Sequence, residues 1–463
     1  MIRRPALAIS GPALDRVFRP LAGLMIAAAL VCAAHASPAQ EDGFRPPSAH
    51  RAAPAPRRQD GAPDRDLLTA PLRSDEPIPA AFRPHVPRRA LTYQRTARAL
   101  GLAGRVWNLI GIWLLLRTGL SARLRDLSLR LARSNPDPPP TLLATALFYA
   151  AYAGIIALWS APFALAGFAL ERKFGFSTQS PGSLLSDACL DYLFSLVMIP
   201  VVWAGYRLYS RTRRWWLWLW ALTAILLLFG IVLQPVLIAP RYNSYTPLPP
   251  GQLRTDILAL AGKAGISGAR VFVKSTSLRS THVNAYVAGI GPTTRIVIND
   301  TALRLLPEDQ ILAMVGHEMG HYVEGHVWIK LSGGVLGAFV FLLLAAGLLP
   351  SLAERMKSRW RLRGVADLAA LPMVFLVMSL FLLIQDPIDS ALSRALEHRA
   401  DAFGLRVSQR PLAMARLFDG FAERDFQDPD PPALLQFWFG THPTLDERIR
   451  FALEQARGMR DNE

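Results

Sequence analysis

Five long stretches of this sequence contain no charged residue and are mainly apolar: 141–170, 192–206, 215–239, 331–353 and 368–385. A helix rises 1.5 Å per residue, so a run of about 20 apolar residues crosses the hydrocarbon core of a bilayer. The second run reaches that length only if residues 184–190 join it. A sixth segment, 97–116, is interrupted by Arg98 and Arg105. The pattern predicts six membrane spans in a mainly α-helical, polytopic membrane protein.

Charge and cysteine content exclude several other classes of protein. Only 19% of the residues are charged, whereas soluble globular chains average about 25%. The net charge is +16, but the arginines cluster beside the apolar runs and do not alternate with exposed aromatic residues. We therefore expect a lipid bilayer, and no nucleic acid, as a partner. Cys32 and Cys189 both lie in apolar segments, which excludes a disulfide framework and a thiolate metal site.

Arginine-rich loops predict the orientation in the membrane. Three loops that follow alternate spans carry four or five basic residues each: 117–133, 207–214 and 355–363. Short basic loops usually face the cytoplasm. Segment 240–330 and the tail from Asp386 would then lie on the extracytoplasmic side of a cell (inner) membrane. This orientation requires 97–116 to span the membrane, and we expect Arg105 to turn into the helical chamber.

The first hundred residues form two regions. Arginines precede an apolar run at 21–34, and the Ala-His-Ala sequence at 34–36 is typical of a cleavage site. Residues 1–36 are thus a signal peptide or, if they are not cleaved, an N-terminal anchor. Residues 37–94 are rich in proline, alanine and arginine, and they predict a disordered linker. The N-terminal membrane helices then occupy 95–239.

A small α+β domain is predicted within 240–463, which also contains the membrane helices near 331–353 and 368–385. Residues 252–264 have helical periodicity, and three short segments alternate like strands: 270–274, 282–288 and 295–299. The last two are joined as a hairpin through Gly289 to Pro292. Pro307 opens a helix that nothing interrupts through Lys330. We expect this helix to continue into the fifth span.

The sequence His317-Glu318-Met319-Gly320-His321 is the strongest indication of chemistry. Two histidines four residues apart on a helix share a face and can bind one zinc ion. A catalytic zinc takes three protein ligands and keeps one position open for water. Glu397 is the best third ligand, since Asp401 lies one turn further on the same face and can support the site. His326 is the competing ligand, although it lies nine residues after His317 and therefore on about the opposite side of the helix.

These residues resemble the type I CAAX prenyl protease family of membrane zinc metallopeptidases. The resemblance covers roughly 95–451 and rests on motifs in the family's order. They are ERKFGF at 171–176, PRYNSYTPL at 240–248, THVNAY at 281–286, HEMGH at 317–321, Glu397 with Asp401, and THPTLDERI at 441–449. The resemblance implies that His317, His321 and Glu397 bind one Zn²⁺ per chain, that Glu318 is the catalytic base and that Asp401 is the proton donor.

Residue chemistry suggests a narrower role for Asp401 and leaves His442 open. A carboxylate one turn from a ligand more naturally accepts the second N–H of a ligand imidazole. His442 is either a catalytic donor that stabilises the oxyanion or a loop histidine before a helix capped by Thr444 with Glu447. The family resemblance favours the catalytic role.

Substrate contacts are predicted at a strand and at one arginine. The segment that contains Asn284 and Tyr286 is either a half-buried strand or an exposed edge that pairs with an extended substrate. Arg448 either binds a substrate carboxylate or pairs with an acidic neighbour.

We therefore expect an integral membrane zinc metalloendopeptidase that acts on a peptide or protein substrate. One alternative is a quality-control protease for membrane proteins that has no prenyl requirement. Another is a catalytically silent membrane scaffold or chaperone, but a structural zinc site would have four protein ligands and no general base.

Overall fold

The computed structural model describes residues 78–460, apart from 136, 138 and 290. The predicted leader at 1–36 and the larger part of the predicted linker lie outside the described residues. Within them, six helical segments are long and apolar enough to cross a membrane, which agrees with the six predicted spans. They are α2 (Arg88–Arg117), α4 (Leu142–Phe174), α5 (Pro181–Ser195) with α6 (Ile199–Arg211), α7 (Trp215–Leu233), α12 (His326–Arg355) and α14 (Leu371–Ser408).

The end of the predicted linker is ordered, contrary to the prediction. Helix α2 begins at Arg88, and the residues before it pack against the C-terminal part of the chain. Ile78 and Phe82 are buried in one cluster with α15 (Pro411–Arg424) and α17 (Leu445–Arg460). Burial of these two apolar side chains offsets the ordering entropy of a proline-rich segment.

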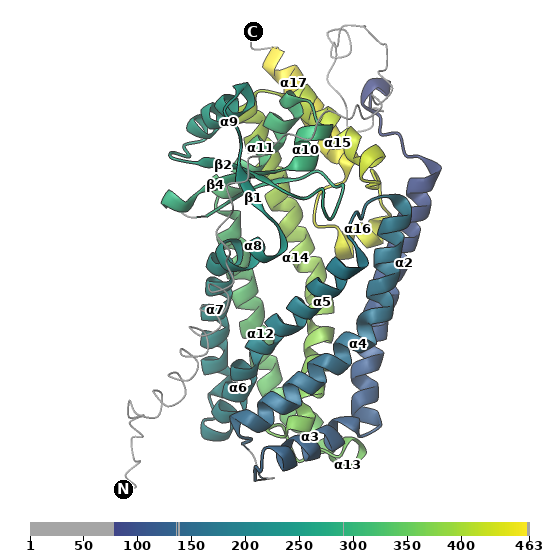
Figure 1. Ribbon diagram of the computed structural model, residues 1–463, viewed down its shortest axis with the longest axis vertical. Helices are drawn as coiled ribbons and strands as arrows, with labels where there is room; N and C mark the ends of the chain where they lie inside the picture. The colour runs from purple at the N-terminus through teal and green to yellow at the C-terminus, as the bar shows by residue number, and fades with distance from the viewer. Residues whose placement is uncertain (1–77, 136, 138, 290, 461–463) are drawn as a thin grey trace.

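The arginine-rich loops lie together at the end of the molecule remote from the sheet. Figure 1 shows α3 (Leu120–Leu131), α13 (Lys357–Trp360) and the turn from α6 to α7 at this end. The Arg125 side chain of α3 is buried there and donates to Asp367 over 2.6 Å. Arg125 also donates to the carbonyl of Arg361 over 3.0 Å, which joins the first basic loop to the third.

The soluble part is a four-stranded sheet covered by helices at the opposite end (Figure 1). The strands are β1 (Tyr245–Pro247), β2 (Arg270–Lys274), β3 (Ala285–Ala288) and β4 (Arg295–Asn299). Their order is β1-β2-β4-β3; β3 and β4 form the predicted antiparallel hairpin, and β2 runs parallel to β4. The sequence did not predict β1, and β3 is shorter than expected because 282–284 lie outside it. Strand β3 is an edge of the sheet.

Helix packing against the sheet builds the core of the soluble part. Helices α9 (Gln252–Lys263) and α11 (Glu308–Val323) bury Ile257 and Ile311 against Ile296 and Ile298 of β4. The short helices α10 (Asp300–Leu305) and α16 (Ala433–Phe439) complete this part of the chain.

The predicted continuous helix from Pro307 into the fifth span is wrong. Helix α11 ends at Val323, and α12 begins at His326. Gly325 between them has a φ of 66°, a left-handed conformation that glycine adopts without steric cost. The chain therefore changes direction here, and the helix that carries the two histidines is separate from the membrane span.

Candidate active site

Helices α11 and α14 cross so closely that only glycine fits at the contact. A Cβ atom at Gly404 would lie 2.7 Å from the backbone nitrogen of His317. On the other helix, a Cβ at Gly320 would lie 3.0 Å from the Cα of Ala400. This close approach brings the acidic residues of α14 against the histidines of α11.

Three side chains converge at this crossing with metal-ligand geometry. His317 Nε2 lies 3.1 Å from His321 Nε2, and Glu397 Oε2 and Oε1 lie 3.3 and 3.4 Å from these two nitrogens. A tetrahedral ion with ligand bonds of about 2.0–2.2 Å separates two ligand atoms by about 3.3–3.6 Å. Glu397 Oε2 is buried without a hydrogen-bond partner among the described residues. Two imidazoles and one carboxylate therefore form a donor set that fits a metal ion.

The second nitrogen of His317 is held by a buried carboxylate. Its Nδ1 lies 2.8 Å from Asp401 Oδ1. Arg448 donates to both oxygens of Asp401, over 2.8 Å from Nε and 2.7 Å from Nη2. Burial lowers the pKa of His317, but the charge and hydrogen bond of Asp401, together with Glu397, outweigh it and raise that pKa to about 9. Because a metal ion binds deprotonated imidazole nitrogen, metal binding here would release a proton.

His326, the competing ligand in the sequence, lies behind His321 and outside the ligand cluster. Its Nδ1 is 2.8 Å from His321 Nδ1, and its Nε2 is 3.2 Å from Glu324 Oε2. The group of residues that could hold a metal contains His317, His321 and Glu397, but not His326. This contact could not be predicted, since in a continuous helix His326 would point away from His321.

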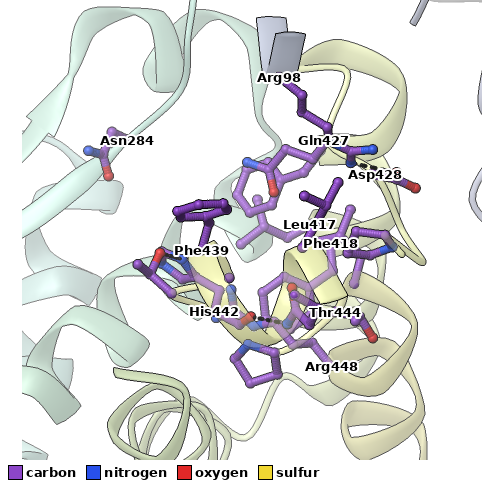
Figure 2. Close-up of a pocket in the computed structure, with 18 of the residues that line it drawn as sticks. Arg98, Asn284, Leu417, Phe418, Gln427, Asp428, Phe439, His442, Thr444 and Arg448 are labelled. Carbon is purple, nitrogen blue, oxygen red and sulfur yellow. Dashed lines mark hydrogen bonds and ion pairs between the residues drawn. The ribbon is translucent and has the colours of Figure 1, made fainter. Parts of the chain in front are cut away.

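A cavity of about 670 Å³ is lined by four of the remaining predicted residues: Asn284, Glu318, His442 and Arg448. Glu318 and His317 line it, and burial raises the pKa of Glu318 above its ordinary value. His442 enters from the loop after α16, with Nε2 3.5 Å from Glu397 Oε2. Figure 2 shows His442 and Arg448 together in the cavity, with Asn284 on the far side.

The loop that carries His442 is fixed from two directions. Arg394 of α14 donates to the carbonyl of Gly440 over 2.7 Å, and Gln436 of α16 donates to the carbonyl of His442 over 2.7 Å. The predicted cap is confirmed: the Thr444 amide donates to Glu447, and the Glu447 amide donates to the Thr444 hydroxyl. The cap and the cavity position are therefore compatible.

Two of the three predicted substrate contacts line the cavity and one does not. Asn284 lines the cavity. Tyr286 does not line it. Its hydroxyl instead donates to the Tyr245 hydroxyl of β1 over 3.1 Å. Arg448 lines the cavity, but it is buried and its guanidinium is paired with Asp401. Of the two alternatives for Arg448, the contacts therefore agree with pairing to an acidic neighbour, Asp401.

Helix α2 forms a wall of the cavity through two arginines. Arg105 lines the cavity, as predicted, and its guanidinium pairs with Asp386 of α14 over 2.5 Å and lies over the ring of Phe439. Arg98, seven residues earlier and two turns away, pairs with Asp428 over 2.6 Å (Figure 2). The sequence did not indicate either acidic partner, because both are distant along the chain.

Comparison with known proteins shows the family. The model described as Peptidase family M48 matches residues 247–456, and the model described as CAAX prenyl protease N-terminal, five membrane helices, matches residues 71–244. YhfN, an uncharacterized metalloprotease of Bacillus subtilis, is 34% identical over 303 residues, 64% of this chain and 70% of that protein. CAAX prenyl protease 1 homolog of Dictyostelium discoideum is 30% identical over 343 residues, 70% of this chain and 76% of that protein.

A solved structure shares the fold. Ste24p of S. mikatae aligns with a TM-score of 0.69 at 21% identity, covering 84% of this chain and 93% of that chain. The aligned relatives, the six apolar helices and the metal-ligand geometry at the crossing of α11 and α14 agree with one another. The chain therefore belongs to peptidase family M48 and is a multi-pass membrane metallopeptidase that hydrolyses peptide bonds.

Proposed function

We propose that the protein is a zinc endopeptidase whose single Zn²⁺ is held by His317, His321 and Glu397. The observation that carries this proposal is the spacing of the three ligand atoms, 3.1 to 3.4 Å, beside a cavity that Glu318 also lines. Three protein ligands leave one position open, which is the arrangement of catalytic zinc sites. Two nitrogens and one oxygen are donors that zinc accepts.

The side chains around the metal site divide the catalytic work. A zinc ion held by His317, His321 and Glu397 would polarise the scissile carbonyl and lower the pKa of a bound water. Glu318 takes a proton from the attacking water and delivers it to the leaving amine. The His442 imidazole stabilises the negative charge that develops on the carbonyl oxygen. Asp401 orients His317, because its oxygens already accept hydrogen bonds from His317 and Arg448.

The substrate of this proposal is an extended polypeptide segment. Strand β3 pairs with β4 on one side only among the described strands, and Asn284 just before it lines the cavity. An edge strand pairs with substrate backbone and needs little side-chain specificity. Relatives named as CAAX prenyl proteases suggest a prenylated peptide. Cleavage of matched peptides with and without the prenyl group distinguishes this substrate from unmodified membrane polypeptides.

Removal of the metal tests the proposal directly. We expect purified protein to contain one equivalent of zinc, and a chelator to abolish peptide cleavage because the polarising ion is lost. Adding Zn²⁺ back should restore cleavage. Elemental analysis of the wild type and of His317→Ala checks the site, since the variant should lose most of the zinc. Full cleavage by metal-free protein would contradict the proposal.

We further propose that the active site faces the extracytoplasmic side. The arginine-rich loops lie at the end of the molecule opposite the sheet and α11, the helix that carries His317 and His321 (Figure 1). Such loops usually remain in the cytoplasm. In a chain with Cys32 and Cys189 replaced by serine, we expect a membrane-impermeant maleimide to label Leu278→Cys on intact cells. Leu278 is 71% exposed on the sheet side. The matched variant is Ser358→Cys, which is exposed in a basic loop and should react only after lysis. Labelling of Ser358→Cys but not of Leu278→Cys on intact cells would show the opposite orientation.

A further inference from the structure

His326 is a buried histidine that the proposed mechanism does not use. It is the first residue of α12, and only 1% of its surface is exposed. Its Nδ1 lies 2.8 Å from His321 Nδ1, and its Nε2 lies 3.2 Å from Glu324 Oε2. Arg399 of α14 donates from Nε to the same Glu324 oxygen over 2.7 Å. These contacts form a chain of four side chains that starts at His321.

The proton positions along this chain follow from the proposed function, on which this inference rests. His321 Nε2 is the proposed ligand atom, so Nδ1 carries the proton of the neutral ring. Two Nδ1 atoms 2.8 Å apart form a hydrogen bond only if one of them accepts. His326 Nδ1 is therefore the acceptor, and its own proton is on Nε2, where it is donated to Glu324.

Each proposed histidine ligand is linked to a carboxylate that an arginine fixes, directly for His317 and through His326 for His321. His317 donates from Nδ1 to Asp401, and Arg448 fixes that carboxylate. His321 donates through His326 to Glu324, and Arg399 fixes that carboxylate. Such partners orient a ligand ring and increase its basicity, and their removal typically costs about 10- to 100-fold in metal affinity.

We propose that His326 and Glu324 are positioning residues that fix the ring and tautomer of His321 and thereby strengthen metal binding. The break between α11 and α12 makes this possible. Gly325 has a φ of 66°, so α12 starts in a new direction, and its first side chain contacts the last turn of α11. Neither residue lines the cavity, so neither contacts the substrate there.

The test compares three substitutions of His326 in the full-length protein. His326→Ala removes the acceptor, and we expect the zinc affinity, measured by competition with a chelator, to fall about 10- to 100-fold. In His326→Asn the side-chain oxygen occupies the place of Nδ1, so this variant should regain most of the affinity. His326→Gln places its polar atoms near Nε2 and should resemble His326→Ala. His398→Ala is the matched control, because His398 is exposed and packs on Phe451.

Two further measurements separate positioning from simple packing. The thermal midpoint of the metal-free protein should change little in His326→Asn, and the visible spectrum of the Co²⁺-substituted protein should match the wild type in that variant but not in His326→Gln. A zinc affinity equal to that of the wild type in all three variants would overturn the inference. The inference would also be overturned if all three variants lost the same zinc affinity and showed a matching fall in the thermal midpoint of the metal-free protein. Zinc binding that is equally weak in wild type and His317→Ala would instead remove the metal site itself, and the inference with it.

Discussion

Replacing Glu318 with glutamine is expected to reduce peptide cleavage by about 100- to 10,000-fold while leaving the metal in place. Glutamine preserves the shape of the side chain but cannot take a proton from water at neutral pH. The proposed ligand atoms belong to other residues, so zinc content should equal that of the wild type. The measurement pairs cleavage of a fluorogenic peptide with elemental analysis of the same sample.

The matched control for this variant is Glu308→Gln. Glu308 is exposed in the first turn of α11, so its substitution removes the same charge from the same helix far from the cavity. We expect the control to cleave peptide at the wild-type rate. Wild-type cleavage by Glu318→Gln would contradict the proposed role of Glu318, whereas loss of zinc in that variant would indicate a structural defect.

Replacing Asp401 with alanine is expected to destabilise the protein by about 3–5 kcal/mol, because it leaves a buried guanidinium without its partner. Asp401 is only 1% exposed, and Arg448 is 8% exposed. The same change removes the acceptor of His317 Nδ1, so zinc affinity should fall about 10- to 100-fold. Thermal unfolding in detergent and chelator competition measure the two effects. Asp389→Ala, an exposed carboxylate of the same helix, should leave stability within about 0.5 kcal/mol of the wild type.

A conservative variant decides between the two roles considered for Asp401. Asparagine can still accept the hydrogen bond from His317 Nδ1 but cannot donate a carboxylic-acid proton. If Asp401 orients the ring, Asp401→Asn should keep measurable cleavage, well above that of Glu318→Gln. If Asp401 is the proton donor implied by the family resemblance, the two variants should be equally inactive.

Local patterns predicted much of the fold and most of the candidate site. Uncharged apolar runs are sufficient to indicate membrane helices, because the bilayer fixes their length. The spacing of His317 and His321 indicates a shared helix face, and the same argument groups Glu397 with Asp401. These inferences need only contacts within one helix.

Contacts between distant segments could not be predicted in the same way. The close crossing of α11 and α14 depends on Gly320 and Gly404, whose importance is visible only when the two helices meet. The position of His326 depends on the left-handed conformation of Gly325, and a helical pattern tolerates an isolated glycine. Tyr286 faces β1, a strand of three residues that is too short for a periodicity argument.

The wall that α2 contributes to the cavity has a consequence for the order in which the protein assembles. Arg98 and Asp428 are 330 residues apart, and Arg105 and Asp386 are 281 residues apart. Since a chain is synthesised from its N-terminus, α2 enters the bilayer long before its acidic partners exist. Its arginines must remain solvated or bind temporary partners until Asp386 and then Asp428 arrive. The cavity therefore closes only near the end of synthesis, and a chain that ends before Asp386 would lack both ion pairs that hold this wall in place, as well as His442.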